Sequence, residues 1–313
     1  MRFVVDEKHD GVLLRSYLKG TLGVSSRLLA RLKAHPQGIL LNGEHVTVRR
    51  ILKAGDVLEI AGQDETAQDA FSPEPLPFGI LYEDEHLLIV NKPPRMPTHP
   101  SNGHDGDTLA NALAYHYASL GKPFVFRPVS RLDRNTSGIL TLAKDQYTAS
   151  ILCKAMKNHA FHKTYLAIVH GHLPQSEGRI ETGIRRITPG IVLREVCDLS
   201  ADGAERAVTD YRVLKEFASH SFVELSPLTG RTHQLRVQLA SLGCPIVGDG
   251  LYHTDDPTLN RHALHACRLE FPHPYREETL QIECPLPDDL QSYLNQLEIM
   301  FNNSKVLDNQ KIL

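Results

Sequence analysis

Helical and strand-like hydrophobic patterns divide the chain into two unequal parts. Near the N-terminus, apolar residues recur at helical spacing over residues 12–22, and a second helix is predicted to begin at Ser25 or Ser26, which are good N-caps. A hairpin around Asn42-Gly43 and a closing strand follow. These elements predict a small α+β domain over residues 1–62.

The next stretch, residues 63–79, is acidic, contains several prolines and has few aliphatic residues. Such a composition is typical of a solvated linker, so we place the domain boundary there. A larger domain is predicted over residues 80–300, and residues 301–313 are expected to form a frayed tail.

The larger domain combines strands with helices. Two strands are predicted around an acidic turn near residues 80–92, and two helices are expected to begin after the capping residues Thr108 and Asp145. Strong alternation over residues 207–214 and 222–225 predicts two antiparallel neighbours. The large domain is therefore predicted to be α+β.

Charge is distributed unevenly along the chain. The formal net charge is -3, which gives no overall basic signature, but residues 11–60 hold eight Lys or Arg against three acidic residues. This local excess of positive charge suits a small phosphate-binding module. On the second predicted helix, the candidate contacts to nucleic acid are Arg27, Arg31 and Lys33.

Composition also sets expectations about compartment and ligands. The five cysteines are scattered and form no Cys-x-x-Cys pair, so we expect reduced thiols in a cytoplasmic protein. No apolar run has the length of a membrane span. The histidine pairs lack nearby ligands at metal-site spacing, and no Gly-rich phosphate loop occurs. We therefore expect no metal site and no cofactor.

One stretch, residues 129–145, has the character of a reactive site. It places Asp133 between Arg131 and Arg134 and then runs through Gly138 into alternating apolar residues. Two cations beside a carboxylate favour its ionised form, which suits a nucleophile or a base. The alternative is a surface carboxylate that only pairs with its neighbours.

Several motifs, taken in order, give the chain a family resemblance. The motifs of the large domain are Asn91-Lys92-Pro93, Arg131-Leu132-Asp133 with Thr136-Ser137-Gly138, Lys163-x-Tyr165-x-Ala167-x-Val169-x-Gly171, Gly230-Arg231-Thr232-His233-Gln234-Leu235-Arg236 and Leu264-His265-Ala266. With these motifs the chain resembles the pseudouridine synthases of family A, of the ribosomal large-subunit type, and residues 1–62 resemble the alpha-L RNA-binding domain first known from a ribosomal small-subunit protein.

The resemblance implies a fold and a set of roles. The fold is a mixed, mainly antiparallel sheet with flanking helices. Asp133 is implied to be the catalytic carboxylate, Tyr165 to lie against the target base, and Arg231 to pair with the carboxylate. Arg131, Arg134 and Lys92 are implied or expected to contact RNA, with Lys92 as a solvated charge.

Two positions depart from the family pattern. Ser130 stands where the family usually has histidine, and Arg95 stands where a glycine usually follows Asn-Lys-Pro-x. We expect Ser130 to alter packing or RNA contact, and Arg95 to add a cation near its loop.

The resemblance implies isomerisation of uridine to pseudouridine in structured RNA by a monomer without membrane contact. Large-subunit ribosomal RNA is the favoured substrate, and transfer RNA is the alternative. A non-catalytic RNA-binding or ribosome-assembly protein is a second possibility. A glycoside-type hydrolase is a third, but it would need a second carboxylate that no motif presents.

Overall fold

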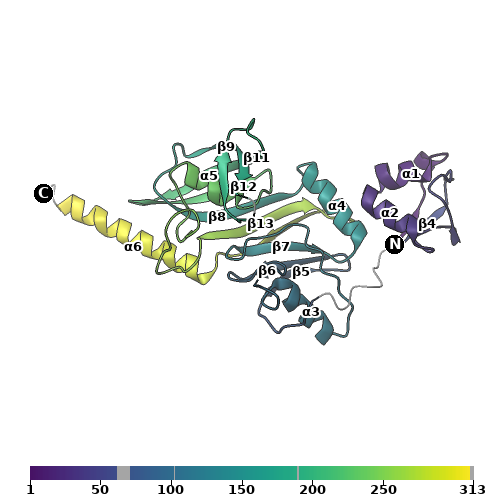
Figure 1. Cartoon of the computed structure of the whole chain (residues 1–313), viewed down its shortest axis with the longest axis horizontal. Coiled ribbons are helices and arrows are strands. Elements are labelled where there is room, and N and C mark those ends of the chain that lie inside the picture. Colours follow the sequence, from purple (N-terminus) through teal and green to yellow (C-terminus); the bar gives the residue numbers. More distant parts are fainter. Residues whose placement is uncertain (62–70, 102, 189, 311–313) are drawn as a thin grey trace.

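The computed structural model describes residues 1–61, 71–101, 103–188 and 190–310, with side chains described as far as residue 303. It contains a small N-terminal domain and a large domain built on one long sheet (Figure 1). The two sheets share no strand.

The N-terminal domain packs short helices on a four-stranded antiparallel sheet of order β1-β4-β2-β3. Asn42 and Gly43 both have positive φ, 52° and 82°, as the predicted tight hairpin requires. The Ser25 side chain accepts a hydrogen bond from the Leu28 amide and caps the second helix, as predicted. The elements are β1 (Arg2–Val4), η1 (Glu7–His9), α1 (Leu14–Ser16), the π-helical η2 (Tyr17–Thr21), α2 (Ser26–Ala34), β2 (Ile39–Leu41), β3 (Glu44–His45) and β4 (Val57–Ile60).

The large domain is organised around a ten-stranded sheet of order β10-β9-β11-β12-β8-β13-β7-β6-β5, in which β14 also pairs with β13. All strand pairs are antiparallel except β13 with β7, which confirms the mainly antiparallel α+β fold. The strands are β5 (Gly79–Glu83), β6 (Leu87–Lys92), β7 (Ser137–Ala143), β8 (His162–His170), β9 (Glu177–Arg186), β10 (Arg194–Cys197), β11 (Glu205–Glu216), β12 (His220–Pro227), β13 (Leu264–Pro272) and β14 (Thr279–Glu283).

Four helices accompany this sheet: α3 (Leu109–Ser119), α4 (Gln146–Lys157), α5 (Gln234–Ser241) and α6 (Asp288–Gln310). Thr108 and Asp145 cap α3 and α4 through their side chains, as predicted. At the start of α5, His233 occupies the N-cap position in the left-handed conformation, and no side chain caps the helix.

The C-terminal helix is longer than the sequence indicated. Residues 301–310, predicted to be a frayed tail, continue α6, and residues 311–313 lie outside the described residues. No glycine or proline follows Pro287, so nothing in the backbone chemistry ends the helix early. Neither α6 nor any other helix among the described residues is long and apolar enough to span a membrane.

The predicted linker is only partly observed. Residues 62–70 lie outside the described residues, but residues 71–78 pack on the large domain. Asn111 of α3 donates from Nδ2 to the Ser72 carbonyl at 2.8 Å, and Leu76 and Phe78 contact the large core. Their burial assigns this half of the predicted linker to the large domain.

The N-terminal domain docks against α4, which lies between it and the long sheet (Figure 1). Tyr147 of α4 is buried in the N-terminal core, with its ring 5.5 Å from that of Phe3. Ser150 of α4 bridges the backbone of the small domain, because it accepts from the Ser25 amide and donates to the Gly23 carbonyl.

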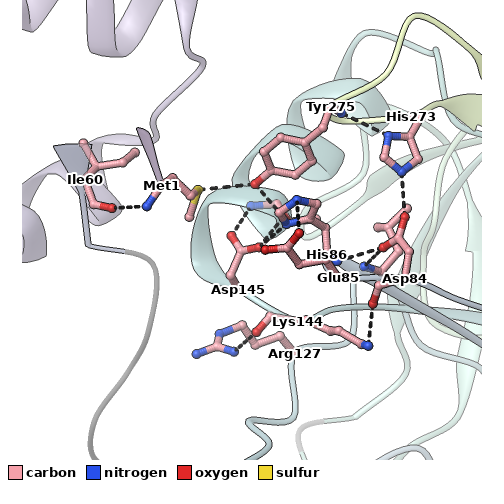
Figure 2. Close-up of polar contacts among 12 residues, drawn as sticks. Met1, Ile60, Asp84, Glu85, His86, Arg127, Lys144, Asp145, His273 and Tyr275 are labelled. Atoms are coloured by element: carbon pink, nitrogen blue, oxygen red, sulfur yellow. Dashed lines mark hydrogen bonds and ion pairs between the residues drawn. The ribbon is translucent and has the colours of Figure 1, made fainter. Parts of the chain in front are cut away.

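A second contact between the domains lies beside the first. In Figure 2 the Tyr275 hydroxyl points across to Met1, whose sulfur accepts its hydrogen bond at 3.3 Å. Tyr275 is held from behind by the His86 ring, stacked on it at 3.6 Å. The docked arrangement therefore uses residues that are far apart in the sequence.

Candidate active site

Asp133 lies in a turn directly before β7. Its carbonyl accepts a hydrogen bond from the Thr136 amide at 3.0 Å, and its side chain is 20% exposed. The start of this turn is fixed by a hydrogen bond that Thr98 Oγ1 donates to the Leu132 carbonyl. Asp133 is thus presented just before the start of β7 with its carboxylate partly accessible.

Gly138 allows the strand after this turn to approach β13. It has φ of 107°, and a Cβ there would lie 2.2 Å from the Ala266 carbonyl oxygen. Ala266 is its register partner in the one parallel strand pair of the sheet. Only glycine fits this conformation and this spacing, so Gly138 lets β13 and β7 meet beneath Asp133.

Arg236 is the guanidinium that pairs with Asp133. Its Nη1 donates to Oδ2 of Asp133 at 3.1 Å, and its Nε and Nη2 bind both carboxylate oxygens of Asp249 at 2.7 and 2.6 Å. Burial by itself lowers the pKa of Arg236, but the hydrogen bonds and charges of the two carboxylates outweigh it and raise that pKa. Arg236 therefore presents a fixed positive charge to Asp133.

His233 lies near the same carboxylate oxygen as Arg236. Its Nε2 lies 3.8 Å from Oδ2 of Asp133, and its Nδ1 lies 2.9 Å from the Tyr252 hydroxyl. Burial lowers the pKa of His233 to about 4, although the negative charge of Asp133 opposes this shift. The imidazole is consequently neutral at neutral pH, so it limits the space around Asp133 without adding a charge.

Tyr165 lies on β8, where it is the register partner of Ala266 on one side and Leu225 on the other. The residue is buried. Burial first, and then the charge of Asp133, raise the pKa of its phenol well above the ordinary value. The phenol therefore stays protonated, and the ring forms part of the wall of the cavity that also contains Asp133.

Asp133 and Tyr165 open into one cavity of about 570 Å³. Its lining combines apolar side chains such as Leu132 and Leu264 with five cationic residues, and among the described residues that line it Asp133 is the one carboxylate. The cationic residues are Arg131, Lys157, Lys163, Arg231 and Arg236. A cavity of this kind suits a ligand that is both flat and anionic, such as a nucleotide within a nucleic acid.

Arg231 does not hold the predicted position. Its Nη1 pairs with Glu205 at 3.1 Å and its Nε donates to the Arg206 carbonyl, so its side chain turns toward β11 at the cavity rim. It precedes α5, whereas Arg236 lies within the first turns of that helix, on its buried face. The prediction that Arg231 pairs with Asp133 was therefore wrong, and Arg236 takes that place.

Lys92 was also assigned wrongly. It is fully buried, and its Nζ donates to the carbonyls of Pro93, Met96 and Arg134. Burial lowers the pKa of this amine to about 7, and the charge of Asp133 partly opposes the shift. Lys92 cannot contact RNA; instead it ties the loop after β6 to the Asp133 turn.

The other predicted RNA contacts are exposed. Arg131 and Arg134 flank Asp133 at the surface, and Arg131 lines the cavity. The basic residues of α2, namely Arg27, Arg31 and Lys33, are exposed on the N-terminal domain.

The two departures from the family pattern have different structural settings. Ser130 lines the cavity rim next to Arg131. Arg95 is exposed with φ of 64°, a left-handed conformation that glycine adopts without strain. The glycine usual at this position thus has a conformational reason, and Arg95 adopts the same backbone at some cost.

Sequence reasoning missed Asp249, Arg236 and His233 as parts of the site. A signal existed for the first two, since each is a charged residue inside an apolar segment, Ile246-Val247-Gly248-Asp249 and Leu235-Arg236-Val237. Buried charges are nearly always paired, so these two could have been matched. Within the parts of the chain that the structure describes, no group of three or more His, Cys, Asp or Glu residues is arranged to hold a metal ion.

Comparisons with known proteins point to one family. The family model described as RNA pseudouridylate synthase matches residues 86–241. The chain is 40% identical over 275 residues to "Uncharacterized RNA pseudouridine synthase YjbO" of Bacillus subtilis (strain 168), covering 88% of this chain and 96% of that protein. It is 36% identical over 272 residues to "Ribosomal large subunit pseudouridine synthase D" of Xanthomonas campestris pv. campestris, covering 82% of this chain and 80% of that protein.

The solved structures point the same way. The human protein "RNA Pseudouridylate Synthase Domain Containing 4" superposes with a TM-score of 0.59 at 27% identity, covering 70% of this chain and 93% of that one. The human protein "RNA Pseudouridylate Synthase Domain Containing 1" superposes with a TM-score of 0.56 at 29% identity, covering 72% of this chain and 96% of that one. With an acidic residue, a tyrosine and a buried arginine around one cationic cavity, the chain belongs to the family of RNA pseudouridine synthases, which isomerise uridine to pseudouridine in RNA.

Proposed function

We propose that Asp133 is the carboxylate that carries out this isomerisation, on uridines of large-subunit ribosomal RNA. The observation that supports the role most directly is the pair with Arg236 at 3.1 Å, because a buried guanidinium anchored by Asp249 holds an oriented positive charge against the Asp133 carboxylate inside the cavity.

The reaction requires three changes at one nucleoside. The bond between N1 of uracil and C1′ of ribose breaks, the free base turns, and a new bond forms between C5 and C1′. C5 loses its proton and N1 takes one up, so the product is an isomer of the substrate. An ionised carboxylate can begin this either by attacking C1′ or by removing a sugar proton. Both routes need the charge on Asp133.

The cavity supplies the remaining requirements. A base released from its sugar must stay close to it, and the buried wall formed by Tyr165 with Leu132 and Leu264 limits where it can go. A paired uridine must also leave its stack to enter, so binding energy from contacts elsewhere on the RNA must offset that cost.

The exposed basic face of α2 can supply such remote contacts. Arg27, Arg31 and Lys33 lie on a domain that docks against α4, close to the large domain that holds the cavity. Ribosomal RNA is favoured because several similar proteins carry the name "Ribosomal large subunit pseudouridine synthase D". Transfer RNA is the second substrate to consider.

The deciding experiment maps pseudouridines in total RNA from cells with the gene, without it, and with an Asp133→Asn allele. Sites that disappear from large-subunit ribosomal RNA in both altered strains would support the proposal. Sites lost only from transfer RNA would show that transfer RNA, and not ribosomal RNA, is the substrate. If no site is lost, a non-catalytic RNA-binding role would be the remaining reading. Release of free uracil from RNA by the purified protein would instead indicate a hydrolase.

A further inference from the structure

A row of side chains lines the cavity between Tyr165 and the end of α4. Lys157, His159, Phe161, Lys163 and Tyr165 are alternate residues, and all five line the same cavity. Tyr165 and Lys163 stand on β8, where alternate residues share a face about 7 Å apart, while Lys157 ends α4. The row therefore connects the proposed base pocket to the end of α4.

Lys163 is the cation of this row nearest Tyr165 in the sequence. Its Nζ lies 5.5 Å from the centroid of the Phe161 ring, and this nitrogen makes no hydrogen bond or ion pair with any residue that the structure describes. Burial lowers the pKa of this amine to about 8. A partly buried cation without a protein counter-ion is arranged to receive an anion from outside the protein.

The row continues across α4. Lys157 and Lys154 are exposed on this helix, and Lys154 lies against Gly23 of the N-terminal domain, whose ideal Cβ would be 3.4 Å from its Cδ. Tyr147 and Ser150 of α4 also contact the N-terminal domain, and these contacts hold α4 beside α2. Lys163, Lys157 and Lys154 thus place cations from the cavity to the edge of the small domain.

We propose that the RNA strand next to the target uridine runs along Lys163, His159 and Lys157 and over α4 to the N-terminal domain, so that cavity and domain bind one continuous strand. Alternating cations and rings are the means by which proteins follow a single strand independently of its sequence. This inference rests on the proposed function only in taking the cavity as the site of the target nucleotide.

The test measures binding of fluorescein-labelled oligouridylate at several salt concentrations. Each lost phosphate contact lowers the slope of log affinity against log salt by about 0.7 for a single strand. We expect Lys163→Met and Lys157→Met each to lower the slope by about this amount, and the double variant to lower it by about twice as much. Lys163→Arg should restore the slope, since it restores the charge.

Lys122→Met is the matched control, because Lys122 is exposed, lies outside the cavity lining and follows α3. Its slope should equal that of the unchanged protein. Unchanged slopes in both Lys163→Met and Lys157→Met, with thermal unfolding preserved, would overturn the proposed path.

Oligonucleotide length tests the continuity of the strand. Arg27→Glu should weaken binding of an oligouridylate of about 16 nucleotides and leave one of about 4 nucleotides unaffected, whereas Lys163→Met should weaken both. If Arg27→Glu has the same effect at both lengths, the two domains bind separate strands and the inference fails. A protein that shows the expected slopes but forms no pseudouridine would refute the proposed function and leave the path intact.

Discussion

Arg236 contacts Asp133 with one nitrogen and Asp249 with its other two, so the carboxylate at the cavity and a fully buried carboxylate share a single guanidinium. Asp249 is inaccessible to solvent and accepts two of the three bonds. The arginine is therefore positioned by the interior of the protein and not by its partner at the cavity. Asp133 can therefore keep an oriented counter-ion while its carboxylate faces the cavity.

The first prediction concerns Asp133 itself. Asp133→Asn keeps the size of the side chain but removes the charge that either proposed route requires, so pseudouridine formation should fall to background. Affinity for RNA should change by less than about threefold, a binding difference of roughly 0.7 kcal/mol. Turnover is measured on RNA carrying a mapped uridine, and turnover close to that of the unchanged protein would exclude Asp133 from the chemistry.

Substitutions of Arg231 and Arg236, which lie in the same motif, should differ in their effect on stability. Arg236→Ala leaves the Asp249 carboxylate buried without its partner, which typically costs about 3–5 kcal/mol of unfolding free energy. Arg231→Ala removes an exposed pair with Glu205, worth at most about 1 kcal/mol. Urea unfolding measures both values, and equal losses would mean that Arg236 does not anchor the site.

Activity separates the same two positions without the risk of unfolding. Arg236→Lys keeps one positive charge but cannot bind two carboxylates at once with three nitrogens. We expect kcat to fall by more than about tenfold, or roughly 1.4 kcal/mol of barrier. Arg231→Lys should leave kcat nearly unchanged, and the reverse order would restore the prediction first made from the sequence.

Gly138 should not tolerate a side chain. Gly138→Ala places a methyl group 2.2 Å from the Ala266 carbonyl oxygen at a φ of 107°, so the parallel strand pair must separate. The expected loss of unfolding free energy exceeds about 2 kcal/mol. Gly20→Ala is the control, since Gly20 has no neighbouring atom within 4 Å of its ideal Cβ and does not have a positive φ. Similar unfolding midpoints for the two variants would contradict the close approach of β7 and β13.

Acid should destabilise the protein through its buried histidines. His265 is fully buried beside Ser137, and burial lowers its pKa to about 4, below the value of about 6.5 in an unfolded chain. Between these values the unfolded state binds more protons, so stability is present above pH 6.5 and is lost as the pH falls toward 4. One such group contributes up to about 3 kcal/mol over this window.

The variant His265→Gln isolates this contribution. In this variant the slope of unfolding free energy against pH between 6.5 and 4 should fall by an amount that corresponds to the uptake of up to about one proton. The control His45→Gln, on the exposed strand β3, should leave the slope unchanged. Parallel curves for His265→Gln and the unchanged protein would show that another group dominates acid unfolding.

Arg95 offers a substitution that should not weaken the fold. Its left-handed backbone costs about 1 kcal/mol for a residue with a Cβ, and glycine removes this strain while adding entropy to the unfolded chain. Arg95→Gly should therefore change stability by less than about 1 kcal/mol. Arg95→Val should destabilise the protein clearly, because a β-branched residue strongly disfavours positive φ. Thermal unfolding compares the two.

Much of this protein is determined locally by its sequence. Ser25, Thr108 and Asp145 begin helices because their side chains accept hydrogen bonds from backbone amides three residues on, and this contact depends only on near neighbours. The hairpin at Asn42-Gly43 is equally local. The mainly antiparallel fold and the family followed from motifs whose order can be read along the chain.

The tertiary structure alone decided which cation faces Asp133 and which cation is buried. Arg231 and Arg236 are five residues apart, but helix α5 turns the second inward and leaves the first at the rim, and the partner of the second is 103 residues away in the sequence. Lys92 likewise resembles a surface charge until the loop after β6 closes over it. Spacing along a chain fixes which residues share a face, but the packing of distant elements fixes what that face meets, because burial and pairing are properties of the assembled fold.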